Sequence, residues 1–468
     1  MTSLKTVLLG SAAGLLAAGA AQAADLPVKK AAAAVQYVEV CPVYGSGFYK
    51  LPGTDICIRH FGYVKMNIGF QNEREAWDVD DRFIEPIVEA GGSNTVGWQW
   101  SIRPGWDFRS PTEYGTLRAV VQMRVDQRNG IFEDDNPVLT GTMRTANLIH
   151  RGYIEWAGFL IGRASTQFTY WDQDDVITAV GGDPKETVTQ VTYVFTGPAG
   201  IKATIGLEDS FTWDGGIRDL TTDPPNAAVN DLGPSRVFDV VGSISTEQAW
   251  GSAKIAGILH FGQVNQDNNN NFAADSADQN VGWAVMGGIT FLLPWLGQKD
   301  QLLLQAQYCD GVNAACGVNG GAANDPSAFE RRGQFLDGLQ RLHDVDAYAH
   351  NNGARGWDFS STKTWSVEGQ LRHYWTPMLR SNLMASYLEI DVPRVGARLV
   401  GVGDATSWDI AANLIWGQNR RTAEIGVEVV YKQLNQSVSR ATRDEANRLG
   451  VDTDPSGWAV VGFIQRSW

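Results

Sequence analysis

Long apolar runs are almost absent from this sequence. A single one lies near the N-terminus, whereas a bundle of membrane-spanning helices needs a run of about 20 apolar residues for each helix. A helical membrane protein is therefore excluded. Disorder is also disfavoured, because 43% of the residues are hydrophobic and 10% are aromatic, which is enough to bury a core.

Basic residues are in deficit. The chain of 468 residues carries 38 Lys and Arg against 52 Asp and Glu, which gives a formal net charge of -14. A charge of this sign repels phosphate, and no basic stripe compensates for it. We therefore expect no nucleic-acid partner.

Cysteine is scarce as well, with four residues in the chain. No CxxC is present and the six His are scattered, so we expect no metal site and no cofactor. Cys41 and Cys57 flank one loop rich in Gly and Pro, and Cys309 and Cys316 flank another. Four cysteines allow three pairings, which the sequence leaves open, and disulfides between the near neighbours are the simplest choice for an oxidising compartment.

Hydrolase motifs are missing too. The chain contains neither a GxSxG elbow nor an HExxH helix, and its His residues do not cluster in sequence. A nucleophile needs an organised base beside it. We therefore expect no catalytic residues, although His residues far apart in sequence can still meet in space.

The one apolar run is part of a targeting signal rather than an element of the folded protein. Lys5 gives a positive start, 7–18 form the apolar stretch, and Ala21, Gln22 and Ala23 form a small-residue cleavage site. This is the pattern of a secretory signal peptide over 1–23. An anchoring helix is the alternative, but the stretch is too short to span a bilayer.

Alternation with a period of two dominates the rest of the chain. Between 116 and 128 the odd positions from Leu117 to Val125 are apolar, and Arg118 and Arg124 lie on the opposite face. Such alternation favours strands over helices. Sixteen strands are predicted, at 57–70, 96–109, 114–126, 149–157, 158–166, 190–197, 201–209, 235–247, 251–263, 281–293, 300–310, 362–375, 380–390, 405–417, 421–432 and 457–468.

The joints between these strands alternate between short and long. An even number of strands with short periplasmic turns and long outer loops is typical of a transmembrane β-barrel. Closure also leaves no strand edge unpaired in lipid. Many of the 17 Trp fall near strand ends or on apolar faces, as the aromatic girdles of a barrel do. The fold class is therefore all-β, a transmembrane antiparallel barrel of sixteen strands.

The chain thus divides into a signal peptide at 1–23, an N-terminal periplasmic segment at 24–56 and a transmembrane barrel at 57–468. The longest loop, 311–361, shows near-helical apolar spacing between 327 and 345, which predicts a short amphipathic helix. Two His in this loop, His343 and His350, are interpreted as surface residues.

Arginines gather on the polar faces of the early strands. In a barrel these faces point into the lumen, and consecutive strands are neighbours. The arginines assigned to a pore constriction are Arg103, Arg118, Arg124 and Arg163. Arg163 differs in sharing a face with Phe159 and Ile161. Two interpretations stay open here, a continuous basic wall or isolated arginines that are each paired locally.

The joint 167–189 is both acidic and apolar. Its carboxylates are Asp172, Asp174, Asp175 and Asp183. Its apolar residues, among them Phe168 and Trp171, favour packing against other parts of the protein. Folded into the lumen, the loop would set its acids against the arginines and create a transverse field at a narrowing. A solvated outer loop is the alternative.

Several segments resemble a known family. The stretches 40–48, 51–59 and 62–64 closely resemble the opening of the alphaproteobacterial general porins. The chain end, 462–468, resembles their final strand, and 159–163 looks like the porin strand that leads into the inward loop. The likeness covers essentially the whole mature chain.

The resemblance implies a homotrimer of sixteen-stranded barrels among the lipids of the outer membrane of a Gram-negative bacterium. It implies passive diffusion of small hydrophilic solutes and ions, with an inward-folded third loop that narrows each pore, and so favours the constriction. The last residue of such barrels is usually Phe, whereas this chain has Trp468, which is still aromatic.

Three other functions compete with general diffusion. A channel specific for sugars or anions stays open, because the wall is basic and the loop acidic. An outer-membrane barrel enzyme lacks its motifs. An energy-dependent transporter needs a plug domain, and the roughly 30 residues before the first strand are too few to fold as one.

Overall fold

The computed structural model describes residues 39–72, 77–80, 83–86, 96–130, 144–171, 187–213, 216–219, 237–263, 279–318, 346–351, 357–395, 397, 402–417, 423–440, 443–444, 454 and 456–468. The chain divides into two compact units, Met1–Val40 and Cys41–Trp468, and every element named below belongs to the second. No helix among the described residues is both long and apolar enough to cross a membrane. The predicted signal peptide lies outside the described residues.

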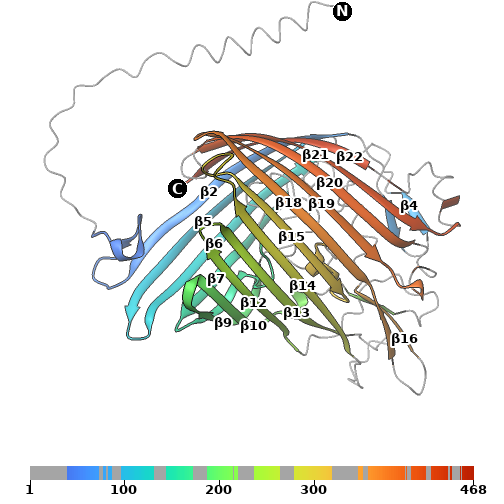
Figure 1. The fold of residues 1–468 in the computed structure, drawn as a ribbon, viewed down its shortest axis with the longest axis horizontal. Coiled ribbons are helices and arrows are strands. Elements are labelled where there is room, and N and C mark those ends of the chain that lie inside the picture. The colour runs from blue at the N-terminus through green and yellow to red at the C-terminus, as the bar shows by residue number, and fades with distance from the viewer. Residues whose placement is uncertain are drawn as a thin grey trace, which may run out of the picture. The chain divides into compact units, whose positions relative to one another are not determined.

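Sixteen antiparallel strands follow one another around a closed ring (Figure 1). They are β2 (Cys57–Gln71), β5 (Val96–Thr112), β6 (Gly115–Gly130), β7 (Arg144–Trp156), β8 (Phe159–Ser165), β9 (Thr187–Thr196), β10 (Ile201–Glu208), β12 (Asp239–Gln248), β13 (Gly251–Gln263), β14 (Gln279–Leu292), β15 (Gln301–Asp310), β18 (Lys363–Thr376), β19 (Leu379–Asp391), β20 (Val402–Gly417), β21 (Ala423–Val438) and β22 (Ser456–Ser467). The ring closes where β22 pairs with β2, from Tyr63 opposite Ser467 to Gln71 opposite Ala459.

The predicted barrel is confirmed, with all sixteen strands at their predicted places. Some strands run further than the alternation indicates. The strand β7 begins at Arg144 rather than 149, and β21 ends at Val438 rather than 432. Beyond the bilayer, outward side chains no longer need to be apolar, so the ladder continues where the apolar alternation stops.

The two faces of the barrel differ in polarity. On β21 the outward side chains of Ile425, Val427 and Val429 are about half exposed, whereas Glu424 and Glu428 point inward and are buried. Large exposed apolar side chains recur on strand after strand. An apolar exterior of this extent is a surface for lipid, and it inverts the arrangement of a soluble protein.

Exposed Trp side chains mark both ends of the strands. Beside the short turns lie Trp156, Trp250, Trp375 and Trp416. Near the opposite strand ends lie Trp98, Trp283, Trp365 and Trp458. Two rings of indoles at two levels correspond to the two water–lipid boundaries.

Parts of the long loops form strands of their own, which the sequence analysis did not predict. The strands β11 (Ile217–Asp219), β16 (Ala347–Asn351) and β17 (Trp357–Ser361) form a small sheet in which β11 and β16 run parallel. A second hairpin joins β3 (Trp77–Asp80) to β4 (Phe83–Pro86). The helix predicted within 327–345, and His343 with it, lie outside the described residues. The backbone of His350 is part of β16.

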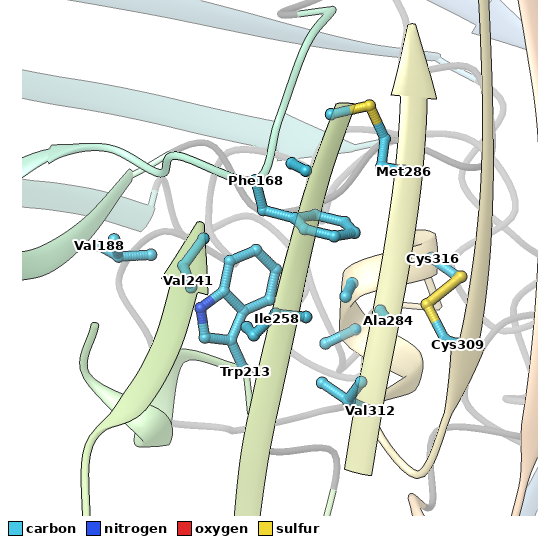
Figure 2. Close-up of a cluster of buried hydrophobic side chains, with 13 residues drawn as sticks. Phe168, Val188, Trp213, Val241, Ile258, Ala284, Met286, Cys309, Val312 and Cys316 are labelled. Carbon is cyan, nitrogen blue, oxygen red and sulfur yellow. A yellow bond between two sulfur atoms is a disulfide. The ribbon is translucent and has the colours of Figure 1, made fainter. Parts of the chain in front are cut away.

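Both disulfides join near neighbours in sequence. Cys41 is bonded to Cys57, with 6.2 Å between their Cα atoms, and Cys309 to Cys316, with 6.1 Å. The second bond closes a short loop that contains the helical turn η3 (Asn313–Cys316). Figure 2 shows this bond at one end of an apolar cluster that also holds Phe168 and Trp213.

Candidate channel lumen

The chain that leaves β8 turns into the barrel at a buried carboxylate. Glu208, at the end of β10, is fully buried. It accepts hydrogen bonds from the Thr166 hydroxyl (2.8 and 2.9 Å to its two oxygens), the Gln167 amide (2.9 Å) and the Trp213 indole (2.9 Å). Three donor groups on one carboxylate fix the point at which the loop departs from the wall.

The next residues dock on strands further around the ring. The Tyr170 hydroxyl lies 2.7 Å from the Oγ of Ser252 on β13 and donates to the Oγ1 of Thr290 on β14 at 2.7 Å. The Trp171 amide donates to Oε1 of Gln305 on β15 at 2.9 Å. Because β9, β10 and β12 lie between β8 and β13, the segment 166–171 runs along the inside of the barrel. We call 166–171 the crossing segment.

Apolar packing holds the crossing segment as well. The Phe168 side chain is fully buried, and its ring meets that of Trp213 edge-on at 5.9 Å (Figure 2). Tyr170 packs on the wall where β14 has Gly288, and a Cβ there would come within 2.2 Å of the tyrosine ring. The inward course predicted for this loop is thereby confirmed over its described part.

The four aspartates assigned to the constriction come later in the same loop. Asp172, Asp174, Asp175 and Asp183 all lie outside the described residues. Their place at the narrowing therefore stays a prediction.

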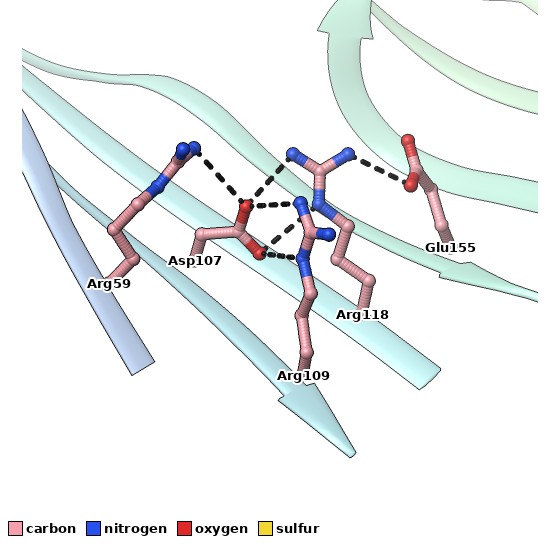
Figure 3. A network of polar contacts seen from close by, with 5 residues as sticks. All are labelled: Arg59, Asp107, Arg109, Arg118 and Glu155. Carbon is pink, nitrogen blue, oxygen red and sulfur yellow. Dashed lines mark hydrogen bonds and ion pairs between the residues drawn. The ribbon is translucent and has the colours of Figure 1, made fainter. Parts of the chain in front are cut away.

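The predicted arginines fall into more than one group. Arg118 belongs to a network centred on Asp107, whose side chain is fully buried (Figure 3). Arg109 and Arg118 each donate two hydrogen bonds to this carboxylate, at 2.9 to 3.1 Å, and Arg59 lies 3.6 Å away. Arg118 also donates to Glu155 at 2.9 Å. Its charge is therefore largely balanced by its neighbours.

Arg103 and Arg124 form a second group, further than Arg109 and Arg118 from the short turn between β5 and β6. Both point inward, together with Arg151 on β7. The Arg103 guanidinium lies 3.3 Å from the imidazole of His150, and Arg124 is paired with the buried Asp126. Arginines on three consecutive strands thus share one stretch of the lumenal wall.

The alternation does not place His150 in the lumen. The pairing of β6 with β7 shifts register between Gln122 and Met123, and this bulge turns His150 inward. Ile149 and Ile154 both face outward although they are five residues apart, so the alternation of inward and outward side chains shifts by one residue between them. A strictly alternating pattern carries no sign of such an insertion.

Arg163 stands apart from the other predicted arginines. It lies opposite Gly152 on β7 and Thr189 on β9. Two residues earlier on β8, Ile161 is exposed on the outer face of the barrel. Arg163 therefore shares the strand face of Ile161, as the alternation indicates.

A second polar wall covers β18 to β21. Arg380 is paired with Glu424 at 2.8 Å, and Asn413 donates to Glu428 at 2.9 Å. These carboxylates and amides are buried. The alternation predicts that Glu424 and Glu428 point inward, but it carries no sign of their partners in the lumen. Among the described residues, no group of three or more side chains forms a candidate metal site.

The comparisons with known proteins agree with this architecture. Residues 25–454 match the Porin subfamily. The chain belongs to this family. The porin Omp2b of Brucella suis is 29% identical over 357 residues, which are 68% of this chain and 87% of that protein. The porin Omp2a of Brucella ovis is 30% identical over 359 residues, which are 68% of this chain and 93% of that protein.

Among solved structures, this porin is similar in fold to the outer-membrane channel DcaP of Acinetobacter baumannii. The TM-score is 0.58 at 16% identity, and the match covers 90% of this chain and 99% of that one. The family and the closed barrel together establish an outer-membrane channel protein.

Proposed function

We propose that this porin is a passive diffusion channel for small hydrophilic solutes and ions, narrowed in each barrel by the loop that contains the crossing segment. The single observation that carries the proposal is the path of 166–171 along the inside of a closed ring whose outer face is apolar. Such a barrel encloses water, and a loop inside it sets the size limit.

At the narrowing, Asp172, Asp174, Asp175 and Asp183 would face the wall that carries Arg103 and Arg124. The crossing segment docks on β13, β14 and β15, whereas Arg103 and Arg124 lie on β5 and β6, so the loop and these arginines occupy different sides of the lumen, which supports this arrangement. Opposed charges across a narrow passage orient polar solutes and set the preference between anions and cations.

Three further properties belong to the proposal. Residues 1–23 are a signal peptide, which fits a family match that begins at residue 25, and 24–56 are periplasmic. The protein is a homotrimer, as its resemblance to the alphaproteobacterial general porins implies. It has no enzymatic activity. Hydrolysis of ester or peptide substrates by the purified protein would contradict that last point.

Single-channel recording in a planar bilayer tests the function directly. We expect stepwise, ohmic currents in KCl and a reversal potential in a salt gradient that reports the ion preference. Blockade by one sugar or one anion at low concentration would favour a substrate-specific channel instead. Absence of conductance from a correctly folded barrel would contradict the proposal.

A further inference from the structure

The disulfide-closed segment 41–57, which we call the mouth segment, lies against the lumenal face of β2. Side chains alternate along β2, so Cys57 shares the inward face with Arg59 and Asn67, while Val64 and Met66 point outward. The bond from Cys57 to Cys41 therefore brings the start of the mouth segment to the inner side of the wall.

The mouth segment is fastened to β2 along its edge as well. Its strand β1 (Tyr49–Lys50) pairs with Ile58 and Cys57. The closing strand β22 reaches β2 only from Tyr63 onward, so β1 pairs with residues of β2 that β22 does not reach. The Tyr49 hydroxyl lies 2.7 Å from the His60 imidazole.

From this attachment, one aromatic ring reaches the charged network of Figure 3. Phe48 is almost fully buried, and its ring centroid lies 4.7 Å from the Arg109 guanidinium and 5.0 Å from that of Arg59. The Tyr44 ring lies 5.8 Å from Arg109. Cation–π contacts of this kind hold an aromatic ring over a guanidinium group. Together with the disulfide, they keep the mouth segment over the wall.

This site is at the periplasmic end of the channel. Arg109 and Arg118 lie on either side of the two-residue turn between β5 and β6. Short turns face the periplasm in outer-membrane barrels. The crossing segment contacts other strands, from β10 to β15, so the two features are separate.

The network at this mouth carries a net positive charge. Three guanidinium groups, those of Arg59, Arg109 and Arg118, face two carboxylates, those of Asp107 and Glu155. One positive charge is left over. The Arg59 side chain is 39% exposed and is the most open of the three, so it is the one that a passing ion meets.

We propose that the mouth segment forms a second narrowing of the channel at its periplasmic end, with the Cys41–Cys57 bond and Phe48 setting the aperture and Arg59 favouring anions. The proposal rests on the channel function proposed above but concerns a different part of the lumen. Phe48 and the disulfide are positioning groups here, and Arg59 is the group that meets the solute.

Two sets of variants in planar bilayers test the narrowing. Phe48→Ala and the double variant Cys41→Ser/Cys57→Ser release the mouth segment, so both should raise the single-channel conductance. The matched control is Val43→Ala, which changes an exposed side chain of the same segment. This control should keep the wild-type conductance. Heat-modified mobility in gels verifies that each barrel is folded.

A third variant, Arg59→Gln, tests the charge. It should move the reversal potential toward cations and alter the asymmetry of current between the two voltage polarities, since the charge lies at one mouth only. A purely structural role of Arg59 would change neither. Unaltered conductance in both release variants, with folded barrels, would overturn the narrowing. Failure of the wild type to conduct would instead overturn the proposed channel function.

Discussion

Single carboxylates organise the inner surface of this barrel. Glu208 and Asp107 are both fully buried, and each accepts several hydrogen bonds. The donors to Glu208 are in the crossing segment and at Trp213, and the donors to Asp107 are on β5 and β6. A buried carboxylate that loses its donors is costly, and so is a set of donors that loses its acceptor. These two residues therefore fix the positions of parts of the chain that the ladder alone does not hold.

Replacing Glu208 with Gln should weaken the attachment of the crossing segment. The amide has one acceptor oxygen for three donor groups, and hydrogen bonds to a charged group contribute about 1.5–3 kcal/mol each. We expect a loss of about 1–3 kcal/mol in the free energy of unfolding, measured by urea titration in lipid vesicles. The control Glu247→Gln changes an exposed carboxylate whose side chain is 81% accessible, and it should be neutral.

Neutralising the arginines should separate those whose charge is balanced by a neighbouring carboxylate from Arg103. Arg103→Gln should move the reversal potential in a KCl gradient toward cations. Arg118→Gln and Arg124→Gln should move it less, because Asp107 and Glu155 balance the first charge and Asp126 balances the second. Equal shifts from all three variants would mean that local pairing does not screen Arg118 and Arg124.

The sequence allows the facing of most lumen residues to be predicted, but not their partners. Alternation is sufficient to direct Arg103, Arg118 and Arg124 inward. It carries no information on Asp107 as the common partner of Arg109 and Arg118, since that depends on cross-strand register. Alternation also assigns His150 to the wrong face of β7, because one inserted residue exchanges the inward and outward positions along the strand.

At the scale of elements, strands that cross the bilayer are predictable and those in the loops are not. A spanning strand must alternate over its whole length, because lipid lies on one side and water on the other. The strands β11 and β16 have only three and five residues, and they pair in parallel although more than 100 residues separate them in sequence. Pairs of this kind depend on tertiary proximity and leave no periodic trace.

The docking of the crossing segment can be tested through two adjacent glycines. Gly288→Ala would place a methyl group 2.2 Å from the Tyr170 ring, whereas Gly287→Ala meets no atom within 4 Å. We expect Gly288→Ala to displace the loop, to change the single-channel conductance and to cost about 1–3 kcal/mol of stability, as overpacking does. Gly287→Ala should behave as the wild type in both measurements.

The acids of the same loop have a separate test. If Asp172, Asp174 and Asp175 line the narrowing, their joint replacement by Asn should move the reversal potential toward anions. The control Glu247→Gln neutralises one exposed carboxylate away from both proposed narrowings and should leave the potential unchanged. An unchanged potential in the triple variant would remove these aspartates from the ion path.

For the whole molecule, the outer face is the property on which insertion depends. Val429 lies in the middle of β21, points outward and is 50% exposed. Arg at such a position costs about 2–4 kcal/mol at the bilayer midplane. We expect Val429→Arg to lower the free energy of unfolding in vesicles by this amount. Val43→Arg, at an exposed position outside the spanning strands, should have no comparable effect.

The pairing of β22 with β2 has a consequence for biogenesis. The last strand to leave the ribosome is the partner of the first, so a chain truncated before Ser456 would expose two bare edges instead of none. Within hydrocarbon, each unsatisfied backbone group on those edges costs several kcal/mol. Stable insertion therefore requires the complete chain, and a partly inserted state of a shortened polypeptide is unfavourable.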